Sequence, residues 1–74
     1  MTKREKAQIA LDAAYYLGEA ALLLMQICEV DMSNIADELG KDALKLEAQY
    51  NVEADIEEQL NERALNREYE REAL

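Results

Sequence analysis

The 74-residue sequence contains no Phe, Trp, Pro or His, only two Gly and a single Cys. Sandwiches and barrels need Gly and Pro at their many turns and β-branched or aromatic residues in their strands, so this composition excludes an all-β fold. With no His and one Cys, the chain also lacks the residues for a Cys/His zinc site, histidine acid–base chemistry or an internal disulfide. The composition predicts an all-α protein that is not an enzyme and binds no cofactor or metal.

Positive charge is scarce and unevenly placed. Acidic residues outnumber basic ones by 17 to 8, which gives a formal net charge of -9. Lys3, Arg4 and Lys6 lie at the N-terminal end, and the segment from Ala7 to Gly40 carries no positive side chain. Nucleic acids and anionic membranes are bound through clustered Lys and Arg, so we expect neither as a partner.

The apolar stretch over residues 13–28 is the longest in the chain, and it contains the single cysteine, Cys28. A membrane span needs about 20 predominantly apolar residues, which is more than this stretch offers. No small-residue cleavage site follows it, so it does not fit a secretion signal. We therefore expect a cytoplasmic protein in which Cys28 is a small buried hydrophobe in a reducing compartment.

Two helix starts are predicted from capping signals. The segment Thr2-Lys3-Arg4-Glu5 matches a capping box, which predicts a helix from Lys3 to about Glu29. Asp31 is a good N-cap for a second helix, and Val30 and Ile35 flank it at the positions of a hydrophobic staple. These signals predict an antiparallel helical hairpin with a tight turn.

The apolar pattern changes phase near Asn51. Before that residue, an apolar stripe follows the second helix at helical spacing and consists of Ile35, Leu39, Ala43, Leu46 and Tyr50. Gly40 is a candidate kink in this helix. After it, the apolar positions are Val52, Ile56 and Leu60. The sequence thus predicts a hairpin over residues 1–50 and an acidic, charged C-terminal helix over residues 51–74, formed either by a third helix from Val52 or by a bent extension of the second.

The first helix is apolar on nearly every side. At 100° per residue its polar side chains fall within a sector about 60° wide. They are Glu5, Gln8, Asp12, Glu19 and Gln26. A helix in a small monomer needs an apolar stripe of only about 100°, so we expect another chain to bury the excess.

A heptad stripe of alternating small and large residues lies opposite that polar sector, and the second helix carries a similar one. The first consists of Ala10, Ala14, Leu17, Ala21, Leu24 and Cys28, and the second of Ala36, Leu39, Ala43 and Leu46. Such stripes allow close helix packing, so we assign them to self-association. The expected assembly is a homodimer of hairpins with a four-helix-bundle-like core.

Two further sets of residues are candidates for binding a different protein. The first is one apolar flank of the first helix, Tyr15, Leu22 and Met25, while Tyr16, Leu23 and Ile27 form the other flank. The second is the acidic run Glu53, Asp55, Glu57, Glu58 and Glu62, which is either a solvated surface or a mimic of nucleic acid that engages a basic protein. We expect a regulator or inhibitor of another protein, such as a nucleic-acid-handling one.

Residues 1–50 resemble the Rop (Rom) family of plasmid RNA-binding proteins. The resemblance lies in Met1-Thr2-Lys3 with Glu5-Lys6, the Ala-rich first helix, the turn at Val30-Asp31 and the layers Ala36, Leu39, Ala43 and Leu46. It implies a four-helix bundle of two hairpins and recognition of paired RNA loops by the first helix. Lys3, Tyr15 and Gln26 would take the RNA-binding roles. The alternative function is therefore a modulator of antisense RNA pairing.

Overall fold

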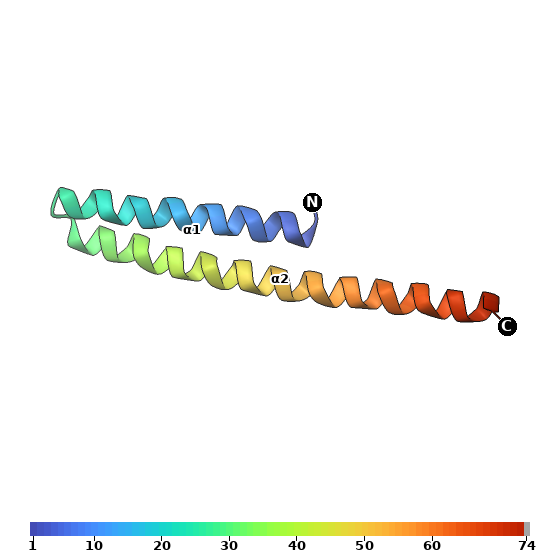
Figure 1. The fold of residues 1–74 in the computed structure, drawn as a ribbon. Helices are drawn as coiled ribbons and strands as arrows, with labels where there is room; N and C mark the ends of the chain where they lie inside the picture. Colours follow the sequence, from blue (N-terminus) through green and yellow to red (C-terminus); the bar gives the residue numbers. More distant parts are fainter. Residues whose placement is uncertain (74) are drawn as a thin grey trace.

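The computed structural model consists of two helices, α1 (Lys3–Gln26) and α2 (Val30–Ala73), folded back on each other as an antiparallel hairpin (Figure 1). It describes the backbone of residues 1–73 and the side chains of residues 1–63. The molecule is a rod 71 Å long, because α2 continues well past the N-terminus of α1. The predicted all-α hairpin is confirmed.

The start of α1 follows the predicted cap. The Glu5 amide donates to Thr2 Oγ1 at 3.1 Å, and the Lys6 amide donates to the Thr2 carbonyl at 3.0 Å. The Thr2 hydroxyl in turn donates to Glu5 Oε1 at 3.2 Å. These bonds satisfy amides that have no partner within the first turn of a helix.

The end of α1 comes earlier than the predicted Glu29, because the chain leaves the helix after Gln26. The Cys28 amide donates to the Met25 carbonyl at 3.0 Å, and the Glu29 amide donates to the Leu24 carbonyl at 2.9 Å. This pair of bonds is the Schellman motif, which requires a left-handed residue just beyond the helix. Cys28 supplies it with a φ of 62°.

Cys28 is exposed, so its predicted burial is wrong. It lies in the turn beyond α1 and cannot extend the apolar stripe of that helix. The prediction failed because the heptad spacing was continued past the point where the helix ends. A non-glycine residue at a position that usually requires Gly gave no sequence signal for the stop.

The start of α2 is displaced from the predicted cap by two residues. The Ser33 amide donates to the Glu29 carbonyl at 2.9 Å, and helix geometry begins at Val30. Asp31 is therefore in the first turn, where its negative charge interacts favourably with the helix dipole, and it is not the N-cap.

α2 is one helix across both proposed interruptions, Gly40 and Asn51. The third helix from Val52 is therefore wrong, and the extension of the second helix is the observed alternative. Gly40 is buried against α1, where a Cβ atom would lie 3.5 Å from the Ala14 carbonyl oxygen and 3.6 Å from Leu17 Cβ. Its role is close packing between the helices.

The contact between the helices, here called the seam, consists of small side chains at three- and four-residue spacing. Its buried members are Ala7, Ala10, Ala14 and Ala21 of α1 with Ser33, Ala36, Gly40, Ala43 and Ala54 of α2. Ser33 Oγ donates to the Ala21 carbonyl at 2.7 Å, which satisfies the one buried hydroxyl among the described side chains. No side chain of residues 1–63 larger than Ala is a buried hydrophobe.

The seam includes the small residues of the two heptad stripes that were assigned to self-association. Ala10, Ala14, Ala21, Ala36 and Ala43 are buried within one chain. Of the larger residues placed with them, Leu17 and Leu24 are half-buried and Leu39 and Leu46 are exposed. The hairpin closes through its smallest residues, which leaves its large apolar side chains outside.

Replacement of Ala21 by Leu should destabilise the hairpin by about 1 to 3 kcal/mol, because the seam has no room for the added atoms. The measurement is the free energy of unfolding in urea, with Ala48→Leu on the exposed surface of α2 as the matched control. Equal stability of the two variants would contradict the packing of Ala21 against α2.

Replacement of Cys28 by Gly should stabilise the chain by about 1 kcal/mol, because Gly adopts the left-handed conformation without a steric penalty. Cys28→Ala removes the same thiol but keeps Cβ, so it serves as the control. The prediction fails if both variants unfold at the same urea concentration.

Candidate protein-binding surfaces

Two apolar faces flank the seam on opposite sides of the hairpin. Face A consists of Ile9, Tyr16, Ile27, Ile35, Leu39 and Leu46, and face B of Leu11, Tyr15, Leu22, Met25, Val30 and Leu44. Each of these side chains is between 40% and 68% exposed. The helical period places the two sets on opposite sides, and the grooves described below agree with it.

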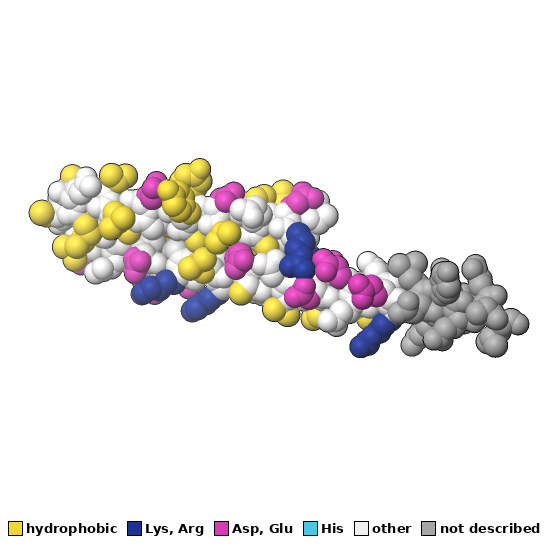
Figure 2. All heavy atoms as spheres, in the orientation of Figure 1, with side chains coloured by type: hydrophobic (Ala, Val, Ile, Leu, Met, Phe, Trp, Pro, Cys, Tyr) yellow, Lys and Arg dark blue, Asp and Glu magenta, His cyan; other side chains and the backbone are white. Residues whose placement is uncertain are grey.

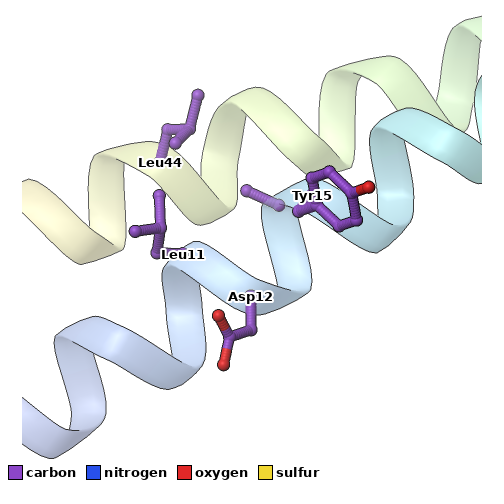
Figure 3. A pocket seen from close by; sticks show the side chains of 5 residues that line it. Leu11, Asp12, Tyr15 and Leu44 are labelled. Atoms are coloured by element: carbon purple, nitrogen blue, oxygen red, sulfur yellow. The ribbon is translucent and has the colours of Figure 1, made fainter.

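Face B contains a shallow open groove of about 430 Å³ between the helices. Its lining consists of Leu11, Asp12, Ala14 and Tyr15 of α1 with Leu44 of α2, and the Leu11 side chain projects toward α2 (Figure 3). Tyr15 Oη donates to Glu19 Oε1 at 2.9 Å, and this bond to a carboxylate raises the pKa of the Tyr15 hydroxyl. The groove is thus apolar at its floor and polar at its outer edge.

The predicted partner-binding residues Tyr15, Leu22 and Met25 all lie on face B and are more than half exposed. Tyr15 contacts Tyr16 of the other flank edge to face, with ring centroids 5.7 Å apart. Leu22 lines a second groove together with Glu19, Leu23 and Gln26. The structure therefore brings this predicted set together on one accessible surface.

Face A has a groove of about 390 Å³ at the end near the N-terminus. Its lining consists of Met1, Lys6, Ile9, Ala10, Ala13, Leu46 and Tyr50. The ammonium groups of Lys3 and Lys6 lie 5.6 Å and 5.9 Å from the centroid of the Tyr50 ring, within the range of a cation–π interaction. Lys6 forms no ion pair with any residue of the described side chains.

A charged cluster joins the start of α1 to the middle of α2. Lys3 Nζ lies 2.8 Å from Glu53 Oε2, and Arg4 Nη1 donates to Asn51 Oδ1 at 2.9 Å. Arg4 also binds Asp55 and Glu58, the latter at 3.3 Å. Figure 2 shows basic and acidic side chains in contact here, while hydrophobic side chains spread over the half of the hairpin near the turn.

This cluster changes the interpretation of the acidic run. Glu53, Asp55 and Glu58 are paired with bases of α1, whereas Glu57 and Glu62 are exposed and have no ion pair among the described side chains. These pairs were not predicted from the sequence, because the partners are about 50 residues apart. A hairpin folded symmetrically about residue 28 places residue 3 opposite residue 53, and this simple count would have found the first pair.

The pKa of Glu53 is lowered chiefly by its bond to Lys3, and the pKa of Lys3 is raised chiefly by the same bond. Both charged forms are therefore favoured over their neutral forms. Both side chains are only partly buried, so the interaction is screened by solvent and salt. It contributes to the position of the α1 start on α2.

The residues proposed for RNA binding do not form one surface. Tyr15 and Gln26 lie on the outer side of α1, whereas Lys3 turns toward α2 and its charge is paired with Glu53. Lys3 and Gln26 are also at opposite ends of α1.

Residues 1–63 contain no group of three or more His, Cys, Asp or Glu side chains arranged to hold a metal ion. Within the helices described, none is long and apolar enough to cross a membrane. The candidate sites are accordingly the two apolar faces and the exposed acidic residues.

Acidification should remove the contribution of the Lys3–Glu53 pair to stability. Because the pKa of Glu53 is lowered from its ordinary value of 4.5 in the folded chain, that contribution is present above pH 4.5 and is lost as the pH falls through the lowered value. Urea unfolding at about pH 7 and about pH 3 should show that Lys3→Met is destabilising only at the higher pH. An equal effect at both values would contradict a contribution from this pair.

The sequence matches no known family model, and comparisons with curated proteins and with solved structures also give no match. A function must therefore be inferred from the surfaces of this chain.

Proposed function

We propose that this protein is a non-enzymatic helical hairpin that self-associates and binds and regulates another protein. The observation that carries the proposal is the inverted distribution of its apolar residues. Only small side chains are buried in the seam, and the Leu, Ile, Met and Tyr side chains of faces A and B remain accessible. A folded monomer exposes isolated hydrophobic residues, but continuous faces of this kind are typical of interaction surfaces.

The size of the chain supports the same conclusion. A domain near 60 residues buries only about 60% of the surface that its unfolded chain exposes, and is correspondingly marginal. In this chain the exposed residues are the large hydrophobic ones, whose burial would contribute the most stabilising free energy. Contacts with other chains would supply the missing burial.

Charge favours a partner with a basic surface. The chain has a net charge of -9, and Glu57 and Glu62 are exposed near the point where α2 leaves α1 behind. Complementary charge accelerates encounter and excludes acidic partners. A nucleic-acid-handling protein has such a basic surface, which makes this class the preferred target.

RNA binding has less support. The Lys3 ammonium group that would contact phosphate is paired with Glu53, and Glu19 accepts a bond from the proposed aromatic residue, Tyr15. Both features place negative charge beside the groups that an RNA backbone would approach.

Site-specific photocrosslinking tests binding to another protein. A photoreactive phenylalanine analogue at Leu22 on face B should give a discrete crosslinked protein band in cells, distinct from crosslinks between copies. The same analogue at Gln8, an exposed residue of the polar sector, is the matched control. The band should weaken when Tyr15→Glu is added. Crosslinks only to RNA, or equal crosslinking from Gln8, would overturn the proposal.

A further inference from the structure

We propose that a second copy of this chain covers face A in an antiparallel arrangement, with the turn of one hairpin beside the N-terminus of the other. In this dimer α1 packs on α1 of the second copy, and α2 packs on α2. The inference rests on the self-association within the proposed function and adds the surface, the orientation and the facing residues.

The exposed area of face A suits a dimer interface. From their fractional exposures, the side chains of face A present apolar surface on the order of 700 Å², close to the roughly 800 Å² per partner of a stable interface. The largest apolar patch of a typical monomer is about 300 to 600 Å². Face A thus provides about as much surface as one side of a dimer needs.

Charge distinguishes the central part of face A from that of face B. Face B contains the ion pair of Asp37 and Lys41, whose charged atoms are 3.3 Å apart, and it ends at the Arg4 cluster. Dehydrating such groups costs free energy. On α1, no charged residue between Ile9 and Ile27 has the helical phase of face A. On α2, Asp42 lies at the outer edge of face A, 3.9 Å from Lys45, and the Lys3–Glu53 pair lies beyond its N-terminal end.

Face A is complementary to itself under a two-fold rotation. The apolar residues of face A are centred near Gly18 on α1 and near Leu39 on α2, and these positions are side by side in the hairpin. A two-fold rotation about that centre, with the axis across both helices, places Ile9 opposite Ile27 of the second copy and Leu39 beside its own counterpart. A two-fold interface requires such matching of one surface with itself.

The charges at the two ends of face A favour the antiparallel orientation. The turn is acidic, with Glu29 and Asp31, whereas Lys6 at the opposite end of face A has no ion pair among the described side chains. The antiparallel arrangement places Lys6 beside the acidic turn of the second copy. A parallel arrangement would instead bring the two acidic turns together, which is unfavourable for like charges.

Sedimentation equilibrium of purified chains tests the choice of face. The unmodified chain should be a dimer at micromolar concentration, and Tyr16→Glu on face A should raise the dissociation constant at least tenfold. Tyr15→Glu on face B, a neighbouring residue of the same type and similar exposure, should leave the dimer unchanged. A monomeric unmodified chain, or equal effects of both substitutions, would overturn the proposal.

Disulfide trapping tests the orientation and does not depend on how Tyr16→Glu folds. A chain with Cys28→Ser, Ile9→Cys and Ile27→Cys should form a covalent dimer under mild oxidation, whereas chains with only one of the two new cysteines should not. Within one chain the two positions are about 27 Å apart along α1, far beyond disulfide reach. Covalent dimers from a single new cysteine, or none from the double variant, would contradict the antiparallel arrangement.

The experiments distinguish failure of the face A dimer from failure of binding to another protein. If the chain sediments as a monomer but Leu22 still crosslinks to another protein, face A has been assigned to the wrong occupant and the binding function stands. If the dimer forms as described and Leu22 gives no position-specific crosslink, the regulatory partner is refuted and the dimer stands.

Discussion

The close approach of α1 and α2 through small side chains determines most of what is distinctive about this molecule. Ala14 and Gly40 meet where neither residue carries more than a methyl group, so the two backbones lie nearer than Leu or Ile would allow. Because the axes are close, larger side chains have no space between them and project to either side. The exposed apolar faces are therefore a direct consequence of the seam.

The turn fixes how the two helices are aligned. Its Schellman hydrogen bonds and the left-handed conformation of Cys28 determine which residues of α1 lie opposite which residues of α2. That alignment brings Lys3 to Glu53 and places Ser33 where its hydroxyl reaches the carbonyl of Ala21. One additional residue within α2, between Ser33 and Glu53, would rotate these two side chains by about 100° relative to each other, so both contacts could not form together.

The sequence was sufficient for the helical hairpin, since capping chemistry at Thr2 and the long apolar run are local signals. The sequence did not show which stripe of α2 packs against α1. On α2, Leu39 and Leu46 follow the same heptad spacing as Ser33 and Gly40, and hydrophobicity alone ranks the leucines first. The structure buries the smaller pair because closer backbones gain more contact per residue. The left-handed backbone conformation of Cys28 could not be predicted either, because glycine is the residue that usually adopts this conformation.

Adjacent apolar residues occur twice on α1, as Tyr15 and Tyr16 and, seven positions later, as Leu22 and Leu23, and all four are more than 60% exposed. At 100° per residue, neighbours in the sequence diverge around the axis, so a doubled apolar residue in each heptad supplies both sides of a thin rod. A helix with such doubled residues exposes apolar side chains over a wide arc, and the other helix of the hairpin covers only part of that arc.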